Sequence, residues 1–216
     1  MARIGTALVL VLSALAARPA LAEDAGRAAP WARLAPLSSD ERSLLERTDR
    51  VTRPLRFRRG ADGEYLGGLS YQVVRARPAD ILAALAKPEH LRQMLPATER
   101  ARLVSSTGRS AKVELVQGKG PFLARYTVHL EQAETGDSIR FWLDKRRPRD
   151  IRDLWGYFRV TPFGHGSTLV TVAAVVDLGP GFARTFFSDK VERVILRTPT
   201  RIKAFVEPRA VALLER

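Results

Sequence analysis

The sequence contains no cysteine, three histidines and two methionines among its 216 residues. The absence of cysteine excludes disulfide bonds, thiolate metal sites and a lipid-modified cysteine anchor. His90, His129 and His165 lie far apart, without ligand spacing such as H-E-x-x-H, so a histidine-rich metal site is excluded as well. The chain also lacks the G-x-S-x-G motif, and the Gly-Lys-Gly turn at 118–120 is too short to cradle a phosphate. The fold must therefore rest on packing alone, and we expect no cofactor.

No apolar run reaches the roughly 20 residues that usually span a bilayer. The longest, Ile4 to Ala17, has fourteen residues, and it lies between the basic residue Arg3 and the small-residue triplet at 20–22. A basic start, a short apolar run and an A-x-A end are typical of a secretory signal peptide. We predict cleavage after Ala22 and a periplasmic or secreted protein, with an uncleaved anchor as the alternative.

Acidic residues are few relative to basic ones. Lys and Arg number 36 and Asp and Glu 23, which gives a formal net charge of +13. Removal of the predicted signal peptide takes away two arginines and leaves 34 basic against 23 acidic residues, a charge of +11. Thirty of the basic residues are arginine, which a GC-rich genome also produces, and an exported protein meets few nucleic acids. We therefore expect no nucleic-acid partner and favour an anionic membrane surface.

Residues 23–63 are predicted to form a flexible leader with a short helix, and residues 64–216 the domain proper. The leader begins with an Ala-, Pro- and Arg-rich stretch without hydrophobic periodicity. Ser38 and Glu41 then fit the spacing of a capping box, which predicts a helix as far as about Asp49. The stretch from Arg53 to Gly63 is rich in arginine and glycine, and we expect a basic loop there.

From Tyr65 onward the period of the apolar residues changes in a definite order. One strand over 65–76 is followed by two short helices, by six strands on short turns and by one long helix. The six strands are expected at 98–106, 110–117, 125–131, 139–144, 154–161 and 168–177. Strands joined by hairpin-length loops form an antiparallel sheet. The helix from Phe182 carries one apolar stripe as far as Phe205; Pro199 should bend it and Pro208 should loosen its end.

Three groups of residues carry a family resemblance. They are Val73, Val74, Ala76, Pro78, Ile81 and Leu85 with the stretch 90–96; Trp155, Gly156, Phe158, Pro162, Gly166, Ser167 and Thr168; and the junction 177–181. In this order of elements the chain resembles the START-like (SRPBCC) superfamily, which includes lipid-transfer START domains, birch-pollen allergens, polyketide cyclases and ubiquinone-binding proteins. The resemblance covers about residues 65–205. It implies an α+β helix-grip fold, a curved antiparallel seven-stranded sheet around a long C-terminal helix, with two short helices after the first strand.

The resemblance also implies a pocket for a hydrophobic molecule between the sheet and the last helix. The inward positions give its candidate walls: Val113, Leu115, Tyr126, Val128, Phe141, Leu143 and Phe158 from strands, and Phe187, Val191, Ile195 and Ile202 from the helix. Tyr126 could serve as a polar handle for the ligand. Gly156, Ala173 and Ala174 are small and could leave space. The alternative is an ordinary solid core.

A basic segment between Trp142 and Trp155 is the candidate membrane contact. Cations beside aromatic rings suit anionic headgroups, although a solvated charged loop is the alternative. The cations that we assign to this contact are Lys145, Arg146, Arg147, Arg149 and Arg152.

We predict non-catalytic binding or transport of a hydrophobic small molecule or lipid by a monomer. One alternative is a cyclase or aromatase that uses a pocket carboxylate or Tyr126; another is an envelope protein interaction module with a filled core. Basic neighbours predict that the carboxylates nearest the pocket mouth are solvated or ion-paired; these are Asp144, Asp150, Asp153 and Asp177. A buried carboxylate without an ion pair would favour the enzyme, and the absence of a cavity would favour the module.

Overall fold

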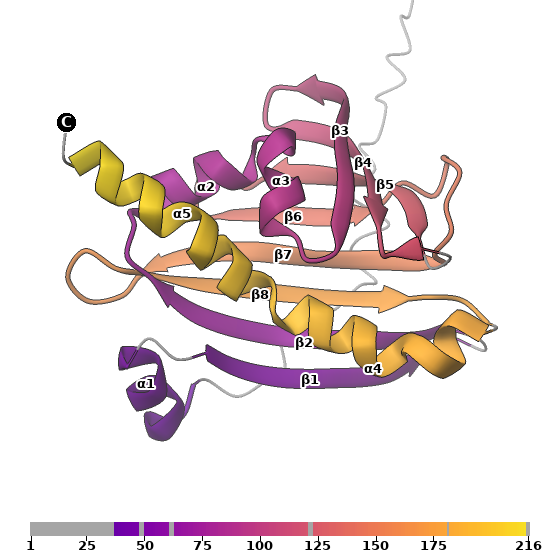
Figure 1. The fold of residues 1–216 in the computed structure, drawn as a ribbon, viewed down its shortest axis with the longest axis horizontal. Helices are drawn as coiled ribbons and strands as arrows, with labels where there is room; N and C mark the ends of the chain where they lie inside the picture. The colour runs from indigo at the N-terminus through magenta and orange to yellow at the C-terminus, as the bar shows by residue number, and fades with distance from the viewer. Residues whose placement is uncertain (1–36, 48–49, 61–62, 121–122, 181, 215–216) are drawn as a thin grey trace, which may run out of the picture. The chain divides into compact units, whose positions relative to one another are not determined.

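The computed structural model describes residues 37–47, 50–60, 63–120, 123–180 and 182–214, without the side chains of 182–187 and 211–214. The predicted signal peptide and the leader as far as residue 36 lie outside the described residues. Within them, one curved antiparallel sheet carries four helices on its concave face (Figure 1). This arrangement confirms the predicted α+β helix-grip fold.

The elements follow one another in the predicted order, with one addition. They are α1 (Ser39–Glu46), β1 (Arg50–Arg59), β2 (Gly63–Val74), α2 (Pro78–Leu85), α3 (Pro88–Met94), β3 (Thr98–Thr107), β4 (Ser110–Gln117), β5 (Ala124–Gln132), β6 (Ser138–Leu143), β7 (Asp153–Pro162), β8 (Thr168–Asp177), α4 (Phe182–Leu196) and α5 (Thr198–Leu214). The strand order across the sheet is β1-β2-β8-β7-β6-β5-β4-β3. The sheet therefore has eight strands, and the predicted number of seven was wrong by one.

The additional strand is β1, where we expected a basic loop. It pairs with β2 from Arg50, opposite Gln72, to Arg59, opposite Gly63. Val51, Leu55 and Phe57 lie on one face of the strand and the exposed Arg56 and Arg58 on the other, at the period of two that a strand requires. Pro54 is compatible with this strand because β1 lies at the edge of the sheet, where a missing backbone N–H breaks no ladder. The arginines and the proline concealed an alternation that the sequence contains.

The long C-terminal helix is bent, as Pro199 predicted. Helix α4 ends at Leu196 and α5 begins at Thr198. Proline has no N–H to donate, and its ring excludes the carbonyl group four residues earlier, so the helix cannot continue straight through this point. The Ser70 hydroxyl of β2 donates to the carbonyl oxygen of Leu196 at 2.6 Å. The bend is thus tied to the sheet. Helix α5 continues past Pro208, so the predicted loosening does not end the helix there.

The main core fills the space between the concave face and the helices. Strand positions on this face, such as Val113, Val160 and Val170, are almost fully buried, as is Ile202 of α5. Among the described helices, none is long and apolar enough to cross a membrane.

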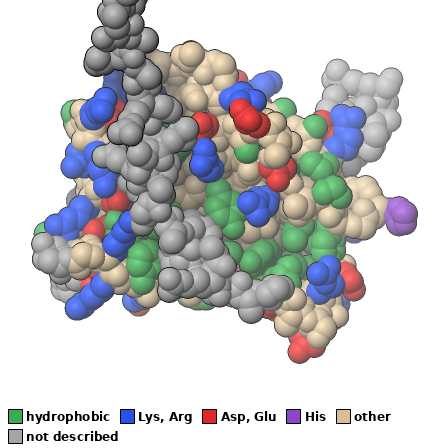
Figure 2. All heavy atoms as spheres, turned by 180° about the vertical axis from the view of Figure 1, so that it is seen from behind, with side chains coloured by type: hydrophobic (Ala, Val, Ile, Leu, Met, Phe, Trp, Pro, Cys, Tyr) green, Lys and Arg blue, Asp and Glu red, His purple; other side chains and the backbone are tan. Residues whose placement is uncertain are grey.

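The central strands also bury side chains on the face turned away from the helices. Leu69, Trp155 and Val175 are all buried there, and Phe57 stacks on Tyr65 with ring centroids 5.0 Å apart. From this side, hydrophobic patches lie among lysine and arginine side chains (Figure 2). Burial on both faces explains why β8 is an almost unbroken apolar run rather than an alternating one.

Helix α1 packs on the edge of the sheet through Leu45, which forms a small buried cluster with Val51 and Val73, and an ion pair to β1 adds to this contact. The Ser38 and Glu41 capping box is formed as predicted, although the helix ends at Glu46 rather than near Asp49. The Arg53 guanidinium of β1 donates to both carboxylate oxygens of Glu41, at 3.0 and 2.6 Å. The hydrogen bond from Arg53 is the main reason that the pKa of Glu41 is lowered from 4.5 to about 2.

We predict that Glu41→Gln lowers the melting temperature at pH 7 by about 1–3 °C. The amide oxygen of glutamine can retain the capping box, so the change removes the charge that pairs with Arg53 and one of the two hydrogen bonds from its guanidinium. A carboxylate whose pKa is lowered by folding stabilises the protein above its unfolded pKa, and this contribution is lost as the pH falls through the folded value. The difference between the two proteins should therefore shrink between pH 4.5 and about 2. Thermal unfolding followed by circular dichroism measures it.

The matched control is Asp40→Asn, an exposed residue in the same helical turn. It should leave the melting temperature nearly unchanged. A difference for Glu41→Gln that stays constant down to about pH 2 would contradict a role for the Arg53 pair.

Candidate functional site

A cavity of about 100 Å³ lies between the concave face of the sheet, the α3–β3 connection and the bend between α4 and α5. Its walls come from every layer of the fold: Leu91, Leu95, Pro96, Leu115, Gln117, Tyr126, Val128, Leu130, Phe141, Leu154, Phe158, Val172, Ala174, Val194, Ile195 and Thr198. None of these side chains carries a charge. Only Gln117, Tyr126 and Thr198 have polar side chains, so the cavity suits an apolar occupant with few polar groups.

The antiparallel register explains how residues distant in sequence meet at this wall. Leu115 of β4 lies opposite Tyr126 of β5, and Phe141 of β6 lies opposite Gly156 of β7, which in turn faces Ala174 of β8. Residues opposite each other project from the same face of a sheet. One inward position from each of five successive strands therefore lines the cavity or supports its lining.

We expected Gly156 to leave open space in the cavity. Instead, the ring of Phe141 occupies the space beside it. A Cβ atom added at Gly156 would lie 2.6 Å from the Phe141 Cζ atom and 2.1 Å from the backbone oxygen of Ala173. Ala173 belongs to the other face of the sheet, because its register partner is Tyr157. Of the three small residues, only Ala174 lines the cavity.

A chain of hydrogen bonds forms the polar end of the cavity. The Tyr126 hydroxyl donates to Gln117 Oε1. The Gln117 side-chain nitrogen donates to Thr98 Oγ1 at 2.6 Å and to the carbonyl oxygen of Pro96 at 3.3 Å. Burial raises the pKa of Tyr126, so its hydroxyl stays protonated at neutral pH. Tyr126, which we named as a polar handle, thus belongs to a fixed network.

Six of the eleven predicted wall residues line the cavity: Leu115, Tyr126, Val128, Phe141, Phe158 and Ile195. Val113, Leu143 and Ile202 are buried in the core outside the cavity lining. Val191 packs against the core and is partly buried. The side chain of Phe187 lies outside the described residues.

The sequence argument missed several lining residues, which fall into three groups. Gln117 continues the inward period of Val113 and Leu115, so alternation could have found it, but a polar residue was not sought in an apolar wall. Val194 and Thr198 lie on the apolar stripe that the spacing of three and four predicts, but they were not assigned to the wall. The α3 residue Leu91, with Leu95 and Pro96 just beyond the helix, could be placed only after the packing of that helix was known.

The buried carboxylates lie outside the cavity lining and have basic partners, as predicted. Asp144 and Asp153 accept from lysines at 3.1 Å, and Asp177 lies 3.9 Å from Arg152. His129 Nε2 also lies 3.3 Å from Asp144. Burial raises the pKa of Asp144, but hydrogen bonds and nearby positive charges outweigh this effect and lower the pKa overall.

The fourth carboxylate, Asp150, is exposed and accepts a hydrogen bond from the backbone N–H of Arg125 at 2.8 Å. Among the described residues, no group of three acidic or histidine side chains could hold a metal ion.

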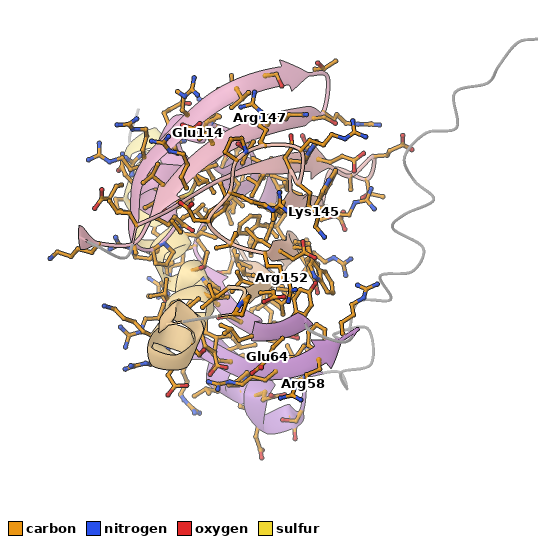
Figure 3. The ribbon with its side chains drawn as sticks, turned by 90° about the vertical axis from the view of Figure 1, so that its right-hand side faces the viewer. Arg58, Glu64, Glu114, Lys145, Arg147 and Arg152 are labelled. Carbon is orange, nitrogen blue, oxygen red and sulfur yellow. The ribbon has the colours of Figure 1, made fainter. Side chains whose placement is uncertain are left out.

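Several cations of the basic segment between β6 and β7 interact with other groups of the protein. Lys145 pairs with Asp153 at 3.1 Å, Arg152 lies near Asp177, and Arg149 donates to the Lys145 carbonyl at 2.7 Å. The ion pairs of the described part include neither Arg146 nor Arg147. Lys145, Arg147 and Arg152 lie at the same end of the sheet in Figure 3.

The two tryptophans that flank this segment belong to the sheet rather than to the loop. Trp142 stacks on His129 with ring centroids 5.1 Å apart, and Trp155 contacts Tyr65 edge to face at 6.3 Å. They therefore pack with neighbouring strands. In the described part, the cations of the segment without an ion pair are Arg146, Arg147 and Arg149; Arg149 is held by the Lys145 carbonyl, Arg146 is exposed and Arg147 is half-buried.

The comparisons with known proteins agree with this architecture. A family profile described as polyketide cyclase/dehydrase and lipid transport matches residues 70–207. No curated protein matches the chain. The structures it resembles include a protein from Thermus thermophilus, with 16% identity, coverage of 67% of this chain and 97% of the other, and a TM-score of 0.57.

Two further solved structures carry descriptive names. A STAR-related lipid transfer protein from Xanthomonas axonopodis has 14% identity, coverage of 71% of this chain and 98% of the other, and a TM-score of 0.55. The Zhui aromatase/cyclase from a Streptomyces species has 11% identity, coverage of 76% and 96%, and a TM-score of 0.56. At such identities these likenesses establish the fold alone.

Proposed function

The chain belongs to the polyketide cyclase/dehydrase and lipid transport family, and from this premise we propose that it binds or carries a hydrophobic small molecule or lipid without converting it. The observation that carries the proposal is the cavity beneath the helix bend, whose lining is uncharged throughout. Burial of apolar ligand surface, at about 25 cal/mol per Å², would drive binding.

The chemistry of the lining favours binding over catalysis. General acid–base catalysis needs a titratable group within hydrogen-bond reach of the substrate. The cavity lining contains no carboxylate, histidine or lysine, and the buried Asp144, Asp153 and Asp177 have basic partners elsewhere. Among the described lining residues Tyr126 is the only titratable one, and its raised pKa makes it a poor base at neutral pH. The cyclase alternative therefore has little support from the lining.

The size of the cavity bears on how a ligand enters. A volume of about 100 Å³ lies below the roughly 300–1,000 Å³ of pockets that hold drug-sized ligands. A lipid or a polycyclic molecule would need more room. We propose that α4 moves outward about the bend at Pro199, because exposed ion pairs contribute much of its attachment to the edge strand. Arg56 of β1 contacts Asp189 and Glu192 of α4 at 2.6 and 2.7 Å.

We predict that enlarging a cavity side chain blocks ligand uptake. Ala174→Leu and Val194→Phe, one from the sheet and one from the helix, should each weaken binding of the neutral probe N-phenyl-1-naphthylamine about tenfold or more, because they fill the space it would occupy. Probe fluorescence measures affinity, and circular dichroism verifies folding. Ala83→Leu, on the exposed side of α2, is the control and should bind as the parent does. Undiminished binding by both folded cavity variants would refute the proposed site.

We further propose that the protein acts outside the cytoplasm, on the basis of the sequence at its N-terminus. When the full chain is expressed in a Gram-negative host, we predict that the periplasmic fraction contains a product beginning at Glu23, identified by mass spectrometry. The variant Val9→Arg/Leu12→Arg interrupts the apolar run, so the uncleaved precursor should stay in the cytoplasmic fraction. A soluble cytoplasmic product that keeps Met1 would contradict export.

An exported carrier of hydrophobic molecules needs a donor or acceptor membrane, and we propose that Arg146 and Arg147 contact its anionic headgroups. Ile151, in the same connection, is buried in the core, and Leu154 just beyond it lines the cavity. A membrane bound at this segment would thus lie near the cavity. Each well-placed cation contributes about 1 kcal/mol near an anionic surface.

We predict that Arg146→Ser/Arg147→Ser weakens sedimentation with vesicles of phosphatidylglycerol and phosphatidylcholine about tenfold or more, and that added salt removes the difference. Arg42→Ser/Arg92→Ser is the control, because it removes the same charge from exposed positions in α1 and α3. Equal loss in both variants would indicate an effect of net charge only, and no loss in either would exclude the contact.

A further inference from the structure

We propose that the cavity selects an uncharged apolar molecule that carries a hydroxyl group at the end beside Tyr126 and Gln117. The inference rests on the proposed function, since it names the class of ligand that the same cavity would take. It follows from the direction of the hydrogen bonds in the polar network and from the absence of charge around it.

The backbone carbonyl of Pro96 fixes the orientation of the Gln117 amide. A carbonyl oxygen can only accept, so the Gln117 atom 3.3 Å from it must be the nitrogen. The same nitrogen donates to Thr98 Oγ1 at 2.6 Å, which uses its second hydrogen. The amide oxygen of Gln117 therefore faces Tyr126. Because that oxygen is an acceptor, the Tyr126 hydroxyl must be the donor of the bond between them.

Once these bonds are made, Tyr126 and Gln117 can accept but not donate, and the Thr98 hydroxyl, outside the cavity lining, donates to the Pro96 carbonyl oxygen at 3.5 Å. The Tyr126 hydrogen is committed to Gln117, and both amide hydrogens of Gln117 are committed to Thr98 and Pro96. The hydroxyl oxygen of Tyr126 and the amide oxygen of Gln117 each retain accepting capacity. A ligand hydroxyl can donate to them. A ketone, an ether or a carboxylate offers only acceptors and would leave two oxygen groups facing each other.

The rest of the lining excludes a charged end group. Among the described residues, no lysine, arginine or histidine lines the cavity, so a ligand carboxylate there would lose its hydration without a compensating cation. Thr198, on the helix wall, can both donate and accept, and therefore does not discriminate between these end groups. Selection thus depends on Tyr126 and Gln117, opposite the bend.

Three matched probes test this inference: 4-propylphenol, 4-propylanisole and 4-propylbenzoate. They share an apolar body and end in a donor, an acceptor or an anion. In isothermal titration calorimetry at pH 7, the phenol should bind about fivefold to tenfold more tightly than the anisole, the difference that one net hydrogen bond provides. The benzoate should bind more weakly than both. Equal affinities for phenol and anisole, or the tightest binding by benzoate, would overturn the inference.

The variant Gln117→Met provides the sharper test. Methionine has a similar size but releases the Tyr126 hydroxyl, which can then donate to a ligand. The anisole should gain relative to the phenol, and the ratio of affinities should fall to about one or below. A purely structural role for Gln117 would weaken both probes equally and leave the ratio unchanged, which would refute the assigned direction. Leu130→Met, also in the lining, is the control and should keep the parent ratio.

The variant Tyr126→Phe covers the case in which Gln117→Met does not fold. The phenylalanine ring fills the same part of the cavity wall as the tyrosine ring. The Gln117 oxygen, no longer bonded to a hydroxyl, can accept directly from the phenol, so the preference for phenol over anisole should persist. Loss of that preference would overturn the proposal. If none of the probes, nor N-phenyl-1-naphthylamine, binds the parent protein, the proposed function fails. If all bind without preference for the donor, only the inference about the hydroxyl fails.

Discussion

The proline at position 199 is the constraint on which the cavity depends. A straight helix of this length would lay one continuous stripe along the concave face and fill it. Because Pro199 cannot donate a backbone hydrogen bond, the helix divides into α4 and α5, and Val194, Ile195 and Thr198 are brought to the cavity from either side of the break. The hydrogen bond from Ser70 to the Leu196 carbonyl then holds the break over β2. The space beneath it is what the sheet and the bent helix leave unfilled.

The sheet sets the shape of that space and the polar network sets its chemistry. Phe141 packs over Gly156, which directs a large ring inward without moving the backbone of β7. Gln117 lies at the end of β4, where the α3–β3 connection brings the Pro96 carbonyl within reach. A glutamine in an apolar wall is costly unless its amide is fully hydrogen-bonded, and here three partners satisfy it. Because both amide hydrogens are used in these bonds, Gln117 can offer a ligand only its oxygen, as a hydrogen-bond acceptor.

Alternation and helical periodicity were sufficient for the fold but not for the whole site. The strand residues Leu115, Tyr126, Val128, Phe141 and Phe158 could be predicted because a period of two assigns each to one face, and a curved sheet buries that face. On the helix, Ile195 lines the cavity as predicted and Val194 and Thr198 lie on the predicted apolar stripe, whereas Val191 and Ile202 of the same stripe pack in the core outside the lining. Which turns of the stripe meet the cavity depends on tertiary packing, which the spacing alone does not encode. Strand β1 was missed because its arginines and proline are typical of loops. These residues belong to a strand only because the segment pairs with β2, and local sequence patterns do not show which segments pair.

The distribution of charge separates the cavity from the basic surface. The three buried aspartates beside the β6–β7 connection and at the end of β8 attract Lys112, Lys145 and Arg152, so these cations serve the fold. The formal charge of the connection is therefore partly balanced within the protein, and among its described cations Arg146, Arg147 and Arg149 have no ion pair. Every lining residue of the described part is uncharged, and Arg146 and Arg147 lie outside the lining. Substitution of these arginines therefore changes the surface charge without changing the cavity wall, so the two proposals can be tested independently.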